Sequence, residues 1–174
     1  RRVLFRSKPL QIGVSACLLG QSVRYDGSHR YDSHIADTLA EQFELIGICP
    51  EVEIGMGVPR PPIQLQLINK QIKLLAVDDP DQDYTETMIE FSKRCLEHYA
   101  FSGMVLKDRS PSCGVGNTPI HSSPSTLGHG LFTQTITADQ PNMPIISAEQ
   151  LQQPGAVVLF IEQVKQFSVT QNHR

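Results

Sequence analysis

The sequence predicts a single α/β domain, built from a mostly parallel sheet with helices on both faces. Two observations predict it. The 174 residues are 40% hydrophobic, which is enough to bury one core. Short apolar segments of strand length alternate with amphipathic segments of helix length, a pattern typical of parallel sheets. Internal repeats and linkers are absent from the sequence, so we expect one domain over residues 11–174. The basic stretch 1–10, "RRVLFRSKPL", is expected to be a flexible leader or a cloning remnant.

Local patterns assign each element. Apolar runs bounded by turn signals predict strands, and apolar residues three or four apart predict helices. In the first helix, Ile35, Leu39 and Phe43 follow a candidate N-cap at Ser33. In chain order we expect a strand at 11–18, a helix at 33–43, a strand at 43–50, one or two strands within 66–77, a helix within 83–102 ended by Gly103, a strand at 102–107, a Gly/Ser/Pro/Thr-rich loop at 108–130, a helix or extended stretch at 131–140, a strand at 143–148 and a helix at 155–169.

Charge and hydropathy exclude several classes of protein. The net charge of -3 leaves no electrostatic footprint for nucleic acid, so we expect no nucleic-acid partner. Apolar runs fall short of the roughly 18–20 residues that span a bilayer, so no membrane partner is expected. Four unclustered cysteines do not resemble a secreted disulfide scaffold. We therefore expect a cytoplasmic protein, a monomer by default, in which each cysteine is a core residue, a nucleophile or a metal ligand.

Three cysteines end apolar runs. Cys17, Cys49 and Cys113 each lie just past the carboxyl end of a predicted strand. Parallel strands place these ends at one edge of the sheet, where α/β proteins bind ligands. We therefore expect the three thiols on one rim. Cys95, on the apolar face of a predicted helix, is expected to be a core residue.

Three readings of the rim remain open. Structural zinc would need a fourth ligand such as His29, His34 or His121, and it usually shows a close C-x2-4-C pair, which is absent. An iron–sulfur cluster on three thiolates would leave one iron without a protein ligand, free to act as a Lewis acid. A thiol redox switch is the third reading.

Polar residues near the same rim suggest chemistry. A carboxylate in an apolar, metal-bearing pocket can act as a general acid or base, and a hydroxyl can donate a hydrogen bond or attack. Basic side chains can balance thiolate charge or hold a substrate. The candidates are Glu51 in "CPE", Ser110 in "SPSC", Arg24, Tyr25 and Asp26 in "VRYDG", Arg60 in "PRPP", and Lys107 and Arg109 in "KDRS".

Four motifs together resemble the bacterial 2-thiouracil desulfurase family: "VSACLLGQSVRYDG", "CPEVEIGMGVPRPP", "LKDRSPSCGVG" and "GHGLFT". The resemblance runs from about residue 11 to about residue 146. It implies a Rossmann-like α/β domain that carries a [4Fe-4S] cluster on Cys17, Cys49 and Cys113, with one open iron. Two positions depart from the pattern we expect. Met56 stands in "GMGVPRPP" in place of a small residue, and Glu53 is a second acid close to Glu51.

The resemblance also implies an activity. The sulfur of a thiocarbonyl would be replaced by oxygen, converting 2-thiouracil or a related thiolated base to the oxo form and releasing sulfide without net electron transfer. The implied catalytic pair is Glu51 and Ser110, with Arg24, Tyr25, Asp26 and Arg60 expected to bind the substrate. The alternative is a zinc- or thiol-stabilised Rossmann-like binding module without catalysis. A nucleotide-binding protein with incidental cysteines is a third hypothesis.

Overall fold

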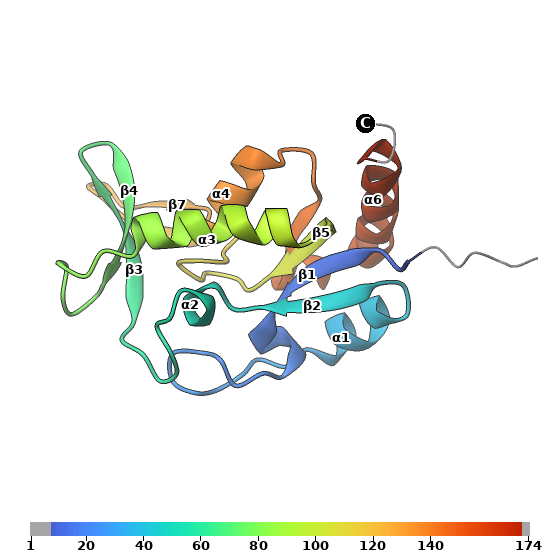
Figure 1. Ribbon diagram of the computed structural model, residues 1–174, viewed down its shortest axis with the longest axis horizontal. Helices are drawn as coiled ribbons and strands as arrows, with labels where there is room; N and C mark the ends of the chain where they lie inside the picture. The colour runs from blue at the N-terminus through green and yellow to red at the C-terminus, as the bar shows by residue number, and fades with distance from the viewer. Residues whose placement is uncertain (1–7, 172–174) are drawn as a thin grey trace, which may run out of the picture.

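The computed structural model describes residues 8–171 and confirms the predicted parallel sheet (Figure 1). Sheet A has the strand order β2-β1-β5-β8, and each pair is parallel. Strand β5 is buried along its whole length, as expected for a central parallel strand. The strands of this sheet are β1 (Gln11–Ser15), β2 (Glu44–Ile48), β5 (Phe101–Leu106) and β8 (Ile145–Ser147).

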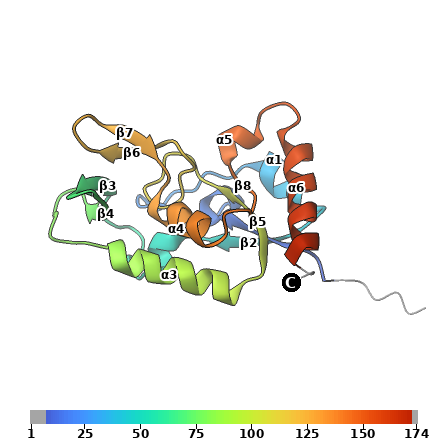
Figure 2. The ribbon, with the colours of Figure 1, turned by 90° about the horizontal axis from the view of Figure 1, so that it is seen from above.

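Helices cover both faces of sheet A, as predicted (Figure 2). Two hydrophobic clusters fill the space between the helices and the sheet. The first cluster contains Ile35 of helix α1 and Phe160 of helix α6, and the second contains Met88 of helix α3 and Phe132 of helix α4. The helices are α1 (Ser33–Ala40), α3 (Thr85–His98), α4 (Leu131–Asp139) and α6 (Ala156–Gln171).

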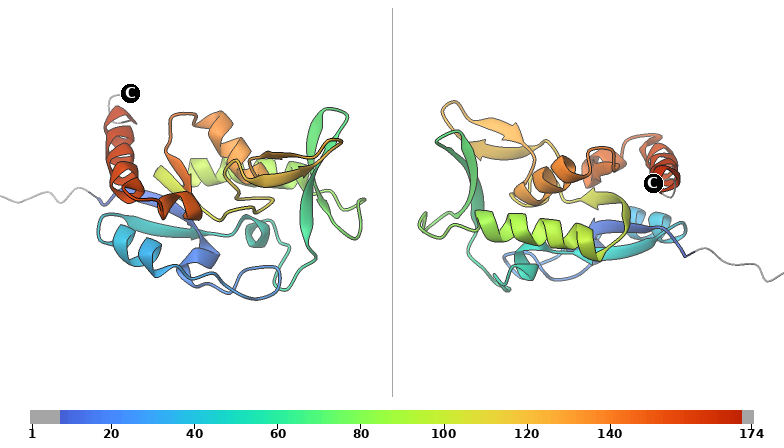
Figure 3. Two further views of the ribbon diagram at one scale, coloured as in Figure 1. Left: turned by 180° about the vertical axis from the view of Figure 1, so that it is seen from behind. Right: turned by 45° about the horizontal axis from the view of Figure 1, so that its top comes forward.

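A second sheet, which the sequence predicts only in part, lies at the end of the molecule away from α6 (Figure 3). Sheet B has the order β4-β3-β6-β7. Its β3–β4 hairpin turns at Asn69 and Lys70, whose φ angles of 50° and 64° are typical of a tight hairpin turn. The two strands β6 and β7 fall within the segment predicted as loop. The strands are β3 (Ile63–Ile68), β4 (Gln71–Ala76), β6 (Thr118–His121) and β7 (Thr126–Gly128).

Two helix ends differ from the prediction. The N-cap of α1 is Asp32, whose side chain accepts a hydrogen bond from the Ile35 amide at 3.1 Å, and Ser33 is the first helical residue. Helix α3 ends at His98, and Gly103 lies inside β5. A Cβ at Gly103 would come within 2.7 Å of a Val164 methyl, so this glycine allows α6 to pack closely on the sheet.

Three short elements were not predicted, and each follows a strand directly or nearly so. They are the 3-10 helix η1 (Ala16–Leu19), α2 (Pro50–Glu53) and α5 (Ala148–Leu151). The segment 131–140, predicted as helix or extended, is helical. Most of the expected leader, residues 1–7, lies outside the described residues. Across residues 8–171, the longest apolar helix is too short to cross a bilayer.

Candidate active site

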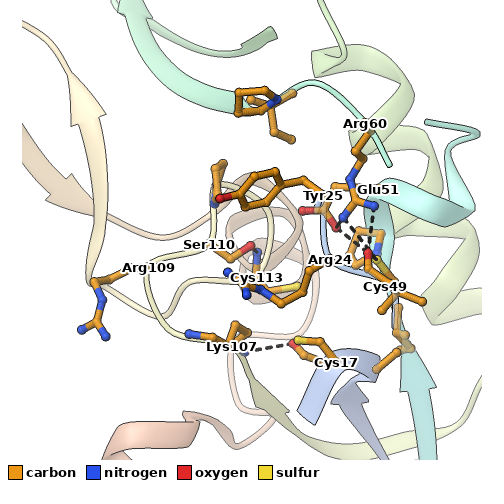
Figure 4. Close-up of a pocket in the computed structure, with 18 of the residues that line it drawn as sticks. Cys17, Arg24, Tyr25, Cys49, Glu51, Arg60, Lys107, Arg109, Ser110 and Cys113 are labelled. Atoms are coloured by element: carbon orange, nitrogen blue, oxygen red, sulfur yellow. Dashed lines mark hydrogen bonds and ion pairs between the residues drawn. The ribbon is translucent and has the colours of Figure 1, made fainter. Parts of the chain in front are cut away.

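The carboxyl edge of sheet A brings the three cysteines to one cavity (Figure 4). Cys17 lies in η1 after β1, Cys49 directly follows β2, and Cys113 lies in the loop after β5. Because β2, β1 and β5 are neighbours, their carboxyl ends are adjacent. The cavity has a volume of about 430 Å³, which suits a small-molecule ligand.

The loop that carries Cys113 is held by its own serine. The Ser110 hydroxyl oxygen accepts hydrogen bonds from the amides of Ser112 at 3.2 Å and Cys113 at 3.0 Å. On the other side, the Thr133 hydroxyl donates to the Cys113 carbonyl at 2.9 Å. These bonds fix the backbone on both sides of the Cys113 thiol.

The start of helix α4 is docked on the same loop. The Leu131 amide donates to the Pro111 carbonyl, and the Gly130 amide donates to the Gly114 carbonyl, both at 2.9 Å. A Cβ at Gly130 would overlap the backbone of Ser112. The glycine of "GHGLFT" therefore permits close contact between backbones, which explains why this motif accompanies "SPSCG".

Asp108 is a site residue that the sequence analysis missed. It is only 4% exposed, and its carboxylate accepts hydrogen bonds from the Asn117 side chain and the Glu149 amide, both at 3.0 Å. The Asn117 side chain in turn accepts a hydrogen bond from the Arg109 amide at 2.9 Å. Asp108 thus fastens the loop to helix α5. A single acid between two basic residues carries no periodic signal that could have revealed this burial.

Burial sets the protonation of the thiols. It raises the pKa of Cys17 and Cys113 above 9.0, and with the charge of Glu51 it raises the pKa of Cys49 to about 12. Lys107 and Arg24 partly oppose the pKa rise at Cys17. The protein alone therefore holds neutral thiols at neutral pH, and metal ligation would release their protons.

The two acids of "CPEVE" face different cavities. Glu51 is 8% exposed and lines the cysteine cavity, with a carboxylate oxygen 3.4 Å from the Cys49 sulfur. Glu53 lines a separate cavity beside Cys95. Burial, followed by the charge of Glu53, raises the pKa of Cys95 to about 11. Of the two acids, only Glu51 lies beside the candidate ligands.

The loop between η1 and α1 contributes two of its three predicted residues to the cavity. Arg24 and Tyr25 line it, with the guanidinium 5.7 Å from the centre of the Tyr25 ring. Asp26 does not line it. Its carboxylate accepts hydrogen bonds from the Ser28 hydroxyl and amide, which lower the pKa of Asp26. Asp26 shapes its own turn, and the structure keeps it out of the cavity.

Lys107 and Arg109 differ in the direction of their side chains. Both belong to the cavity wall, and the Lys107 ammonium donates to the Asp108 carbonyl at 3.1 Å. The Arg109 guanidinium forms an ion pair with Glu149 and points away from the thiols (Figure 4). Lys107 and Arg24 oppose the pKa rise at Cys17 and Arg60 opposes the pKa rise at Cys49, whereas Arg109 is paired with Glu149.

Comparison with known proteins agrees with this geometry. A family model described as 2-thiouracil desulfurase matches residues 12–148, a span that includes all three cysteines and both Glu51 and Ser110. The chain belongs to the 2-thiouracil desulfurase family. A relative, the uncharacterized protein YbbK of Bacillus subtilis (strain 168), is 31% identical over 112 residues, covering 59% of this chain and 72% of YbbK.

A solved structure is also similar to this member of the desulfurase family. It is the [4Fe-4S]-dependent thiouracil desulfidase TudS, at 29% sequence identity and a TM-score of 0.64. The match covers 86% of this chain and 97% of TudS. The similarity therefore extends over the whole of the TudS fold.

The cavity of this desulfurase-family chain offers three cysteine sulfurs and no histidine as donors. Zinc–sulfur bonds of about 2.3 Å place the thiolates of a zinc site about 4 Å apart. Within residues 8–171, no three His, Cys, Asp or Glu side chains are close enough to hold one ion. The histidines considered as a fourth zinc ligand, His29, His34 and His121, do not line the cavity. Cysteine thiolates are the donors that hold iron–sulfur clusters, so the residues present fit such a group chemically.

Proposed function

We propose that this protein is a [4Fe-4S]-dependent desulfidase that acts on 2-thiouracil or a related thiolated base. The observation that carries the proposal is the convergence of Cys17, Cys49 and Cys113 with Glu51 and Ser110 on one cavity. Family membership and the similarity to TudS support it. The proposed reaction exchanges the thiocarbonyl sulfur for a water oxygen and releases hydrogen sulfide. Carbon keeps its oxidation state, so no reductant or oxidant is needed.

Cys17, Cys49 and Cys113 would hold the cluster. When bound, the cluster supplies a Lewis-acidic iron without a protein ligand, which makes a thiocarbonyl carbon more electrophilic. Two nearby cations, Lys107 and Arg24, would offset the thiolate charge, as their effect on the pKa of Cys17 indicates. Both come from loops at the same edge of sheet A, so the fold provides them together with the ligands.

We assign the general base to Glu51. Its carboxylate is largely excluded from solvent and lies beside a ligand thiol, where a water that attacks the substrate carbon would be within reach. Glu51 would accept one proton from this water as the carbon–oxygen bond forms, and then return it to the departing sulfur. Ionised again by that transfer, Glu51 would accept the second water proton from the new hydroxyl as the carbon–sulfur bond breaks and pass it to the sulfide, so both water protons leave as hydrogen sulfide.

We assign hydrogen-bond donation to Ser110. A hydroxyl has two acceptor lone pairs and one proton to donate. Both lone pairs of Ser110 are occupied by the amides of Ser112 and Cys113. Its proton therefore remains available, and Ser110 lines the cavity. It would donate to a polar atom of the substrate ring and so orient the base.

Arg24 and Tyr25 are proposed to bind the substrate at the mouth of the cavity. The Tyr25 side chain is large, planar and 48% exposed, which suits stacking against a pyrimidine ring. Arg24 is also held by a hydrogen bond to the Ser28 hydroxyl at 2.9 Å.

Further, we propose that the protein is one domain from residue 11 onward and acts as a cytoplasmic monomer.

Anaerobic reconstitution tests the proposal. The chain is loaded with iron and sulfide and then assayed with 2-thiouracil and a panel of thiolated bases and nucleosides. We expect a brown protein with about four irons and four acid-labile sulfides per chain, and release of sulfide and oxo-base in equal amounts. A colourless preparation that binds zinc and releases no sulfide would favour the non-catalytic binding module instead.

A further inference from the structure

Arg60 links the segments that form the wall of the cavity. It precedes strand β3, and its side chain is only 5% exposed. Its guanidinium lies beside Glu51 and above Cys49 (Figure 4). The sequence analysis placed Arg60 among the residues that bind the substrate. A buried guanidinium in a catalytic cavity has two possible partners, the substrate and the protein. The hydrogen bonds that Arg60 donates show which of the two it engages in this structure.

The protein already engages most of these donors. One terminal nitrogen, Nη1, donates to the carbonyls of Val23 at 2.8 Å and Gly57 at 3.0 Å. The other, Nη2, lies 3.8 Å from the Glu51 carboxylate and 3.8 Å from the Cys49 sulfur. The Arg60 amide donates to the Tyr25 carbonyl at 3.0 Å. Nη1 thus bonds two protein carbonyls, and Nη2 lies beside two protein groups, Glu51 and Cys49, so both terminal nitrogens already interact with the protein.

These partners belong to three different parts of the chain. Val23 and Tyr25 lie in the loop after η1, Cys49 and Glu51 lie at the start of α2, and Gly57 lies between α2 and β3. Within residues 8–171, no other side chain bonds to all three segments. Arg60 therefore connects the loop that carries Tyr25 to Glu51 and Cys49.

We propose that Arg60 is a positioning residue. It holds the Glu51 carboxylate against the Cys49 sulfur and fastens the Tyr25 loop over the cavity, without contacting the substrate. This inference rests on the proposed desulfidase function for its kinetic consequences only. The planar fork of arginine can reach two carbonyls with one nitrogen and a carboxylate and a cysteine sulfur with the other, whereas lysine carries a single point charge.

Steady-state kinetics at matched iron content test the proposal. Arg60→Gln and Arg60→Lys should lower kcat about 10- to 100-fold, because a displacement of about 1 Å in a catalytic group costs that much. Their KM should stay within about twofold of wild type, since no substrate contact is lost. The Lys variant keeps the charge, so its failure to restore kcat would show that the geometry of the fork matters. Arg94→Gln, on the exposed side of α3, is the matched control and should behave as wild type.

Hydrogen exchange in the protein without its cluster provides a second measurement, independent of activity. Amides in the segment 21–28 should exchange several-fold faster in both Arg60 variants, because the side-chain bond to the Val23 carbonyl is lost and only the backbone bond to Tyr25 remains. Amides of helix α3 should be unchanged. Iron bound per chain after reconstitution should also fall, because the Cys49 sulfur loses its neighbouring donor.

Two results would overturn the inference. A KM raised 10-fold or more with unchanged kcat would place Arg60 in contact with the substrate. Unchanged kinetics and unchanged exchange in the 21–28 segment would leave it no positioning role. If wild type desulfurates none of the thiolated compounds, the proposed function fails, and the exchange and iron measurements still decide whether Arg60 organises the cavity.

Discussion

The Ser110 hydroxyl holds the Cys113 loop, and we propose that it also donates to the substrate. Its oxygen accepts two amide hydrogen bonds, and its proton is not used by either of them. Ser110→Ala should cost about 1 kcal/mol of stability, similar to the loss of a helix cap. It should keep the cluster but lower turnover about 100-fold. Iron content and initial rates of the anaerobic protein measure the two effects.

Cys113→Ser is the paired variant. It should lose the cluster and turnover together, since it removes a proposed ligand, so the two substitutions separate ligation from chemistry. A Ser110→Ala protein that works at the wild-type rate would show that the serine only shapes the loop.

Glu51 and Glu53 form a natural pair for testing the general base. They lie two residues apart but face different cavities. Glu51→Gln should lower kcat by about 100-fold or more, because the amide cannot accept the proton from water. Glu53→Gln should keep kcat within about twofold of wild type. Equal losses in both variants, measured at equal iron content, would contradict the assignment of Glu51.

At the scale of elements, helix α4 packs its first residues directly on the Cys113 loop. Gly130→Ala places a methyl group into the backbone of Ser112 and should cost about 1–3 kcal/mol. It should also reduce iron binding, because the Cys113 loop must move. Gly155→Ala is the control: its φ of 79° makes alanine unfavourable by about 1 kcal/mol, but nothing lies near the new methyl.

Urea unfolding and iron content report the two effects of Gly130→Ala. We expect both variants to be destabilised and only Gly130→Ala to bind less iron. Full iron loading of the Gly130→Ala protein would mean that the loop tolerates the displacement.

Some elements could be predicted from sequence and others could not, for a physical reason. Strands β1 and β5 are the two central strands of sheet A, so they read as apolar runs. Strands β6 and β7 are short, and Pro119 interrupts the first of them. They exist because Ile120 pairs with Leu65 of β3, 55 residues earlier in the chain. A local sequence pattern cannot reveal pairing between strands that are so far apart in the chain.

The same distinction holds for the site. The shared rim of Cys17, Cys49 and Cys113 could be predicted, because parallel topology alone brings strand ends together. The partners of Arg60 and Asp108 could not be predicted. They come from segments 37 and 41 residues away in sequence, at Val23 and Glu149, and only the folded chain brings them together.

For the whole molecule, the buried thiols predict a dependence of stability on alkaline pH. Cys95, which is not a proposed ligand, has its pKa raised by burial from 9.0 to about 11. Between these values the unfolded chain loses the thiol proton and the native protein keeps it. The free energy of unfolding should therefore fall as pH rises from 9 to 11, by up to about 1.4 kcal/mol per pH unit for this thiol.

Cys95→Ala removes this contribution. Urea unfolding of both proteins at several pH values from 8 to 11 measures the difference between their slopes, which cancels the titration of lysines and tyrosines. The wild-type protein should lose stability more steeply than the variant above pH 9. Parallel curves would show that the Cys95 thiol ionises equally in both states.

The three thiols follow strands that are neighbours in sheet A, but 31 and 63 residues lie between them in the sequence. Bringing three such distant points together in an unfolded chain requires two long loops to close, at an entropic cost that no nearby C-x-x-C pair reduces. The burial of apolar side chains on sheet A offsets that entropic cost during folding. On the proposed function, the polypeptide should therefore fold first, and the iron–sulfur cluster should be inserted afterwards. A nascent chain in the cell would have little ability to capture stray metal ions before it folds.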